Sequence, residues 1–369
     1  MKKFVWFLTL MLTLSLVLSA CGAPAATQPP APTTVPPTQA PATQAPTEAP
    51  TQAATQAATQ APATQAPATG AFRVAVVMPS AKNDLAFSQS MYDALTRVQQ
   101  EMGKDKFDFV FSENMFVVDD AAAAIRDYAS QGYNLVIAHG SQYGSSLQEI
   151  APDFPKTSFA WGTTADTFGQ PNIFAYQASS EEGGFVNGVM AATLSKSNVI
   201  GVIGPIETGD AKLYVDGFKA GALSVKPNAK VNVNYIGSFS DTALAAEAAK
   251  THIAAGADVL TGSAQMVTGA IGVAKDKNVL WFGTQSNQTS LAPSIVVASQ
   301  VYHWEGILKE MISSIQSGTL GGKTFTANLA NGGEVIEFNP DSTVAKDAQT
   351  LANTTIEGIK NGSVKITLP

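Results

Sequence analysis

Six segments of the chain combine neutral hydrogen-bonding side chains with aromatic or soft apolar ones, and each follows a short apolar run. The first of them, 79–90, supplies the candidate ligand-binding residues Asn83, Asp84, Phe87 and Ser88. An aromatic ring can stack on a flat ligand while amide and hydroxyl groups bond to the ligand's edge. Phe87 could equally be a structural residue that anchors the start of a helix, and its spacing alone does not decide between the two roles.

The later segments repeat this composition. Their candidate ligand-binding residues are Gln142, Tyr143, Trp161, Phe239, Gln265, Met266, Gln285, Asn287 and, further along, Trp304. Asp241 is expected to cap a helix rather than to contact a ligand. Because amides and rings dominate and paired charges are sparse, a neutral flat heterocycle suits these segments better than an amino acid or a phosphate.

Catalytic motifs are poorly represented. The three histidines, His139, His252 and His303, are scattered, and none has a carboxylate or second histidine at metal-ligand spacing. The segment 140–144 resembles a nucleophile elbow but places its serine one position too early. We therefore expect a binding protein with no catalytic residues, no metal and no cofactor, and not an enzyme.

Strands and helices must position these segments. In the sequence, short β-branched runs alternate with stretches of helical spacing. The alternation predicts an α/β fold with parallel sheets covered by helices on both faces. It breaks near 180–184 and resumes at 198–203, which indicates two doubly wound sheets. Sheets that face each other across the carboxyl ends of their strands form a cleft for a ligand.

Two late strand-like runs, 279–283 and 295–299, suggest that the chain crosses back between the two lobes in a multi-stranded hinge. On this basis the first lobe is expected to span about 71–180 and 285–318. The second is expected to span about 181–284 and 319–369. Together they form one substrate-binding domain over 71–369.

The amino-terminal region carries an export signal. Lys2 and Lys3 precede an uncharged, mainly apolar stretch, and small residues follow just before Cys21. This pattern predicts a signal peptide over 1–20 and a lipobox in which Cys21 becomes the lipidated first residue. The alternatives are a plain secretory signal and an uncleaved anchor, although about 15 apolar residues fall short of the roughly 20 that a bilayer requires.

Residues 22–70 consist almost entirely of alanine, proline, threonine and glutamine, with Glu48 as the only charge. Such a segment cannot form a core, so we expect 21–70 to be the lipidated cysteine followed by a disordered tether. With Cys21 as the single cysteine, no disulfide is available. The chain is expected to be held to the outer side of the cell membrane by its lipid alone. The net charge of −7 disfavours nucleic acid as a partner.

Three stretches carry a family resemblance. They are Asp84 to Ser90, with Phe87 and Gln89 at fixed places; Asp216 to Gly221; and Gly237 to Asp241. Their order and spacing resemble the basic membrane protein family, lipoproteins similar to the purine nucleoside receptor. The resemblance implies a two-lobed type I periplasmic-binding-protein fold, a role as the substrate-binding component of an ABC importer with permease subunits as partners, and a ligand ring stacked near Phe87.

The chain also departs from that family. Nucleoside-binding members carry an acidic residue where this chain has Gln285 to Gln288, and a lysine where it has Tyr302. A carboxylate accepts ribose hydroxyls better than an amide does, so the loss of the acidic residue disfavours a nucleoside. The region 285–293, followed by Tyr302, His303 and Trp304, resembles a subgroup of the family that binds free purine bases. We rank a purine base first, a nucleoside second and another polar solute third. An extracellular sensor domain or, less readily, an exported enzyme are the alternative functions.

Overall fold

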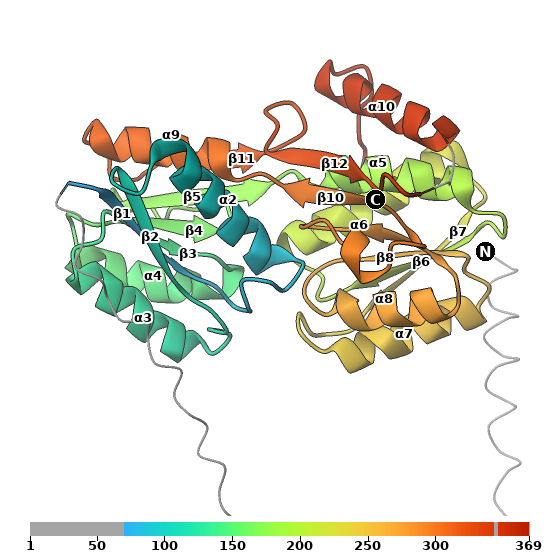
Figure 1. Ribbon diagram of the computed structural model, residues 1–369, viewed down its shortest axis with the longest axis horizontal. Coiled ribbons are helices and arrows are strands. Elements are labelled where there is room, and N and C mark those ends of the chain that lie inside the picture. Colours follow the sequence, from blue (N-terminus) through green and yellow to red (C-terminus); the bar gives the residue numbers. More distant parts are fainter. Residues whose placement is uncertain (1–69, 343–345, 369) are drawn as a thin grey trace, which may run out of the picture. The chain divides into compact units, whose positions relative to one another are not determined.

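The computed structural model describes residues 70–342 and 346–368. The predicted signal peptide, the lipidation site Cys21 and the tether lie outside the described residues. Within the described part, strands and helices alternate as expected and form two six-stranded sheets, each covered by helices (Figure 1). The α/β prediction is confirmed.

The first sheet is parallel throughout and has the strand order β11-β5-β4-β3-β1-β2. Its strands are β1 (Phe72–Val77), β2 (Phe107–Ser112), β3 (Leu135–Ala138), β4 (Ser158–Gly162), β5 (Ile173–Ala178) and β11 (Thr324–Ala327). Alternate residues of β1 enter different cores because a strand points successive side chains to opposite faces. Val74 and Val76 pack with α2 (Phe87–Met102) and α9 (Glu305–Gln316), whereas Ala75 and Val77 pack with α3 (Val118–Ser130) and α4 (Gly144–Ile150).

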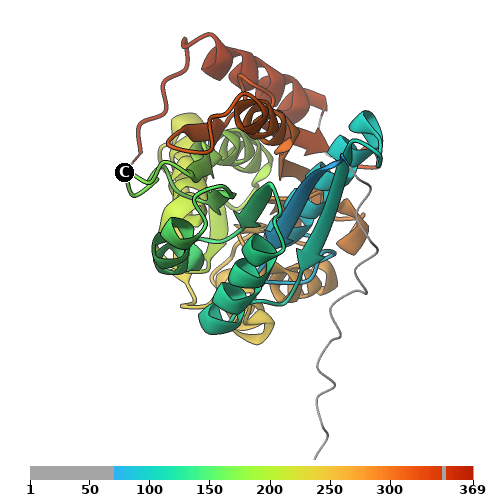
Figure 2. The same cartoon turned by 90° about the vertical axis from the view of Figure 1, so that its left-hand side faces the viewer.

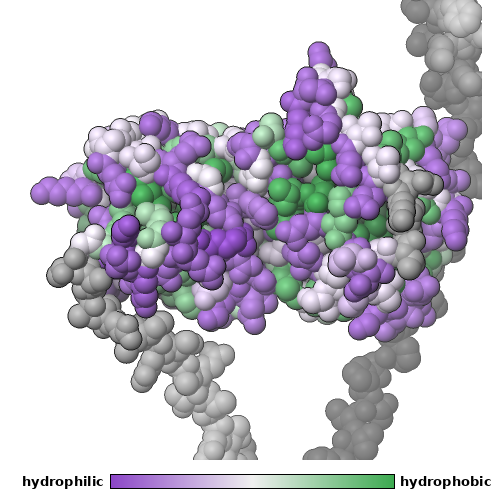
Figure 3. Space-filling view, turned by 45° about the horizontal axis from the view of Figure 1, so that its top comes forward, coloured by the Kyte–Doolittle hydropathy of each residue, from purple (hydrophilic) through white to green (hydrophobic). Residues whose placement is uncertain are grey.

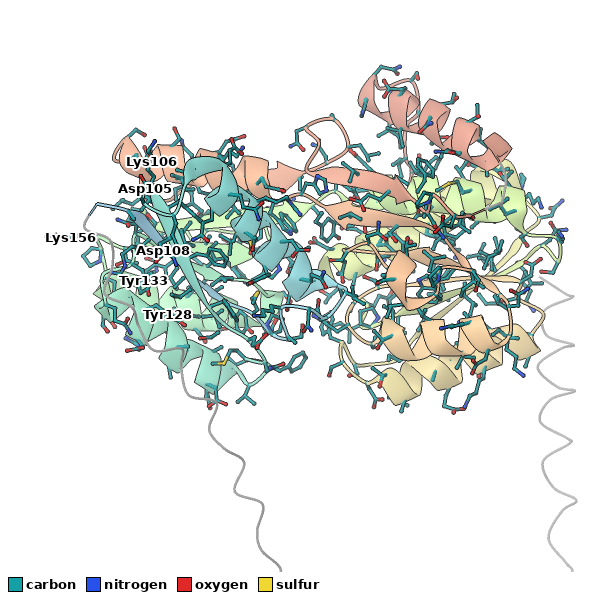
Figure 4. The ribbon with its side chains drawn as sticks, viewed as in Figure 1. Asp105, Lys106, Asp108, Tyr128, Tyr133 and Lys156 are labelled. Carbon is teal, nitrogen blue, oxygen red and sulfur yellow. The ribbon has the colours of Figure 1, made fainter. Side chains whose placement is uncertain are left out.

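Figure 2 views the molecule from the side of this first sheet and shows its strands lying between helices. In Figure 4, Asp105 and Lys106, just before β2, and Tyr133, just before β3, mark the amino ends of its strands. There Tyr133 packs edge to face against Tyr128, with ring centroids 5.3 Å apart.

The second sheet has the strand order β12-β10-β9-β8-β6-β7. Its strands are β6 (Val199–Gly204), β7 (Lys230–Tyr235), β8 (Val259–Gly262), β9 (Leu280–Gly283), β10 (Val296–Tyr302) and β12 (Glu334–Phe338). One face packs against α5 (Ser180–Leu194), α6 (Gly209–Val225) and α10 (Lys346–Lys360), and the other against α7 (Thr242–Ala254) and α8 (Val267–Asp276). β12 runs antiparallel to β10, whereas the other strand pairs of this sheet are parallel.

Short turns complete the described elements. They are the 3₁₀ helices η1 (Ser141–Tyr143), η2 (Ala151–Asp153) and η3 (Thr289–Leu291). Asp241 caps α7 as predicted, its carboxylate accepting a hydrogen bond from the Leu244 amide at 2.9 Å. On the face drawn in Figure 3, hydrophilic residues cover much of the surface and hydrophobic ones gather in small patches.

Helices α5 and α6 pack backbone to backbone through glycines. A Cβ atom on Gly188 would lie 2.0 Å from the Phe218 carbonyl oxygen, and one on Gly221 would lie 2.0 Å from the Phe185 carbonyl oxygen. No side chain fits in either place, so glycine is required by contact rather than by backbone angles. The glycine-containing stretch 216–221, noted in the sequence for its family resemblance, thus fixes α6 against α5.

The chain passes between the sheets three times: from β5 into α5, from β10 into α9, and from β11 into β12. The expected division into lobes needs correction because β10 pairs with β9 and β12 in the second sheet, whereas 285–318 was expected in the first lobe. Likewise β11 pairs with β5 in the first sheet, although 319–369 was expected in the second. The runs 279–283 and 295–299 both belong to the second sheet, and the crossings follow β5, β10 and β11.

Candidate ligand-binding site

A pocket lies where loops from both sheets meet. The empty space between its lining residues, including the part that is open to solvent, is about 540 Å³. The loops that form it follow β1 to β4 in the first sheet and β6 to β9 in the second. Its lining residues are Pro79, Phe87, Phe116, Gly140, Ser141, Gln142, Thr163, Thr208, Gly209, Asp210, Ala211, Phe239, Ala264, Gln265 and Gln285. The carboxyl ends of both sets of parallel strands therefore build the site, as the sequence predicts.

Phe87 belongs to the core and also lines the pocket. It is the first residue of α2 and is 7% exposed. Its ring lies parallel to the ring of His139, with centroids 3.8 Å apart and an interplanar angle of 7°. The two readings of Phe87 are thus not exclusive, because a ring supported on one face can present the rest of its surface to the pocket.

His139 is a fixed support for that ring. Its Nε2 lies 3.0 Å from the Phe87 carbonyl oxygen and its Nδ1 lies 2.6 Å from the Tyr176 hydroxyl. A carbonyl can only accept, so Nε2 carries the proton and Nδ1 accepts from the Tyr176 hydroxyl. Burial lowers the pKa of His139 to about 3, and the imidazole is neutral at physiological pH.

The pocket edge is formed by neutral amides. Gln142 follows β3, Gln265 follows β8 and Gln285 follows β9. The Oε1 atoms of Gln265 and Gln285 are buried and have no hydrogen-bond partner among the described residues. Since unsatisfied buried polar atoms are rare in proteins, these two oxygens are available to a ligand.

Three residues of the lining adopt backbone angles that favour glycine. Thr163, Ala264 and Gln285 have φ values of 64°, 74° and 69°. Non-glycine residues with positive φ are strained by about 1 to 3 kcal/mol each and cluster at binding sites. The strain at the ends of β4, β8 and β9 agrees with a site that is shaped for a purpose other than stability.

Five of the predicted site residues line the pocket: Phe87, Gln142, Phe239, Gln265 and Gln285. The remaining eight do not line it. In the first sheet's loops, Asp84 accepts hydrogen bonds from the Ala86 and Gln89 amides at 2.9 and 3.0 Å and so organises the start of α2. Ser88 is buried, and its hydroxyl accepts a hydrogen bond from the Ser80 amide at 3.2 Å, while Asn83 is exposed.

Three aromatic candidates from the first lobe also have structural roles. Tyr143 is buried and donates its hydroxyl to the Met115 carbonyl at 2.7 Å. Trp161 donates its indole N–H to the Gly140 carbonyl and stacks on Phe168, with centroids 4.8 Å apart. Trp304 is fully buried and donates to the Ser90 hydroxyl at 2.9 Å. Each ring is directed into the first lobe's core by the hydrogen bond it makes.

In the second sheet, Met266 is buried in the core between the sheet and α7 and α8. Asn287 is exposed and donates its amide to the Glu337 carboxylate at 2.6 Å. Tyr302, which stands where relatives were expected to have a lysine, is buried with its hydroxyl 2.6 Å from that of Ser180. Asn287 and Tyr302 are therefore both outside the pocket lining.

The sequence prediction missed Asp210, Thr208, Thr163 and Phe116, all of which line the pocket. Asp210 and Thr208 directly follow the run 198–203, and the rule that the ends of parallel strands build the cleft would have found them. Phe116 lies in the loop after β2, close to Ser112 and Asn114, and this loop was not among the segments singled out in the sequence. Phe116 is 43% exposed.

Within 70–342 and 346–368, no group of three or more histidine, cysteine or acidic residues is arranged to hold a metal ion. None of the helices in this described part is both long and apolar enough to cross a bilayer. No lysine or arginine is among the described residues that line the pocket.

Comparison with known proteins places this site in a family. Residues 71–367 match the family model described as the ABC transporter substrate-binding protein PnrA-like family, named Bmp. A purine-binding protein of Brucella abortus is 30% identical over 263 residues, covering 70% of this chain and 73% of that protein. An ABC transporter nucleoside-binding protein, BmpA of Lactococcus lactis, is 27% identical over 296 residues, covering 74% and 83%.

Solved structures agree on the fold. A solute-binding protein of an ABC transporter system from Conexibacter woesei superposes with a TM-score of 0.68 and 21% identity, covering 81% of this chain and 99% of that one. At this identity the likeness shows the fold alone. The type I periplasmic-binding-protein fold expected from the sequence is confirmed.

Proposed function

We propose that this chain, which belongs to the PnrA-like family of ABC transporter substrate-binding proteins, captures a purine base in its pocket and delivers it to the membrane permease of an importer. Membership of the family makes it a substrate-binding protein and not an enzyme. The identity of the ligand and the mode of membrane attachment are what we propose beyond family membership.

The observation that carries the ligand assignment is the division of the pocket into aromatic and amide surfaces. Phe87 comes from the first sheet's loops and Phe239 from the second's, so each contributes a ring to the pocket. Gln142, Gln265 and Gln285 supply donors and acceptors suited to the edge of a heterocycle. The lack of lysine and arginine in the described lining disfavours phosphorylated ligands.

Two relatives support a purine compound of some kind, since one is named for purine binding and another for nucleoside binding. We place the free base before the nucleoside because the pocket lining takes an amide, Gln285, from the segment in which nucleoside-binding members of the family carry an acidic residue. Asp210, which the sequence reasoning did not weigh, supplies a carboxylate from another element. A nucleoside therefore remains the second candidate.

The amino-terminal sequence pattern supports a site of action on the outer side of the membrane. A signal peptide over 1–20 and a lipid on Cys21 would hold the protein on the outer side of the membrane, with 22–70 as a tether. Such a tether has an end-to-end distance on the order of 40 Å if it behaves as a flexible chain. That reach would let the pocket collect solute and still contact permease subunits.

Native mass spectrometry of the domain 71–369, purified without added ligand, tests this function. We expect a fraction of the protein to carry extra mass equal to that of a purine base, released on mild activation. Extra mass matching a sugar, an amino acid or a peptide would contradict the proposal.

A further inference from the structure

Asp210 is a buried acid in the pocket with a free acceptor. It is the second residue of α6, lines the pocket and is 6% exposed. Its Oδ2 atom is buried and has no hydrogen-bond partner among the described residues. By contrast, Asp216, one and a half turns further along α6, forms an ion pair with Lys212. Asp210 therefore keeps one carboxylate oxygen for which the described residues supply no partner.

The groups around Asp210 do not neutralise it. Glu181 of α5 repels its charge, and the groups facing it from β5 and β10 are the tyrosines Tyr176 and Tyr302, both buried and uncharged. Burial raises the pKa of Asp210 to about 7, with Glu181 adding to the rise and the Ala178 backbone opposing it. The amino end of α6 favours the ionised form because the helix dipole is positive there. Near neutral pH the free protein thus holds Asp210 as a mixture of its two forms.

We propose that Asp210 accepts a hydrogen bond from the bound ligand and that the ligand binds to its ionised form. The proposal rests on the ligand-binding function proposed above and deepens it, because it requires the ligand to carry an N–H or O–H donor. A donor group of the ligand would supply the hydrogen bond that Oδ2 lacks among the described residues. The N–H groups of a purine base and the hydroxyls of a ribose both have this chemistry.

A pH dependence follows. A ligand that hydrogen-bonds to the carboxylate lowers its pKa, so binding below neutral pH must first release the proton. With a free pKa of about 7, the apparent affinity is reduced about 11-fold at pH 6 but only about 1.1-fold at pH 8. The dissociation constant should therefore rise about 10-fold from pH 8 to pH 6, with proton release on binding. A protonated Asp210 that donates to the ligand would give the opposite slope.

The test is calorimetry of the full chain with guanine at pH 6, 7 and 8, in two buffers of different ionisation enthalpy. We expect proton release and the 10-fold slope in the wild type, and neither in Asp210→Asn. Asp210→Ala, which lacks any acceptor, should bind about 10- to 100-fold more weakly at pH 8. Asp216→Asn is the control on the same helix and should keep the wild-type slope, and thermal unfolding checks that each variant is folded.

Guanosine and 2′,3′-dideoxyguanosine distinguish the source of the donor. Equal dependence on Asp210 for both nucleosides assigns the donor to the base, whereas loss of that dependence in the dideoxy compound assigns it to the ribose. If guanine and guanosine both bind with no pH slope, or with the same slope in Asp210→Asn, the role of Asp210 is overturned while the proposed function stands. If none of the three compounds binds, the purine assignment fails and this inference fails with it.

Discussion

Replacing Phe87 by alanine separates the two roles that the structure gives this ring. Phe87 is packed against His139 on one side and borders the pocket on the other. Loss of base stacking costs about 1 to 3 kcal/mol. We therefore expect the affinity for a purine base to fall about 5- to 150-fold in Phe87→Ala.

The same change should also lower stability. Truncation of a buried phenylalanine costs about 3 to 5 kcal/mol, and we expect about 2 to 4 kcal/mol here because the space left behind joins the pocket instead of forming a closed cavity. For a domain of this size that corresponds to a decrease in melting temperature of about 3 to 6 °C without ligand. Calorimetry measures the first effect and thermal unfolding of the free protein measures the second.

Phe174→Ala is the matched control. Phe174 is fully buried in the same core cluster but does not line the pocket, so the change should reduce stability and leave affinity within about twofold. If Phe87→Ala lowers the melting temperature while affinity is unchanged, Phe87 is a core residue only and the stacking argument is refuted. An equal loss of affinity in Phe174→Ala would mean that general loosening, and not stacking, is being measured.

Three further changes test other parts of the account. Gly221→Ala places a Cβ 2.0 Å from the Phe185 carbonyl oxygen and should lower the free energy of unfolding, measured in urea, by about 1 to 3 kcal/mol. Gly272→Ala is the control: this position on α8 faces open space, and the change should raise the free energy of unfolding by up to about 1 kcal/mol. Cys21→Ala should release the folded protein from the membrane fraction, because the lipid is its proposed anchor; continued tight association would contradict this. Burial raises the pKa of Glu334 well above its ordinary value of 4.5, so the stability that the protonated group contributes in acid is lost as pH rises above that value. Glu334→Gln should therefore flatten the fall in unfolding free energy as pH rises above 4.5, and an unchanged pH profile would count against this role.

The strands and helices near the pocket were predictable because their patterns are local. The run 198–203 corresponds closely to β6, and the run 279–283 corresponds closely to β9. The sheets that β10 and β11 join were not predictable. Which sheet a late strand joins depends on contacts with residues far away in the sequence. Local spacing does not report those contacts, and the predicted lobe boundaries are wrong for that reason.

The residues of the candidate site were also predictable only in part. Position at a strand end correctly identified Phe87 and Gln285 as lining residues. Composition could not tell them from Tyr143 and Trp304, whose polar atoms are satisfied by backbone or core partners. The side chain's direction is set by the hydrogen bond it finds, and the sequence does not record that. Tyr302 is the clearest case, since a lysine there would place a charge in the core instead of in the pocket.

The most direct measurement of the central claim is calorimetric titration of the domain 71–369 with adenine, guanine and hypoxanthine, each compared with its nucleoside. The account predicts that at least one base binds and that it binds more tightly than its nucleoside, because a buried sugar would leave hydroxyls imperfectly paired at about 1 to 3 kcal/mol each. Tighter binding of the nucleosides would contradict the assignment to a free base. Absence of binding by all six compounds would contradict the purine assignment itself.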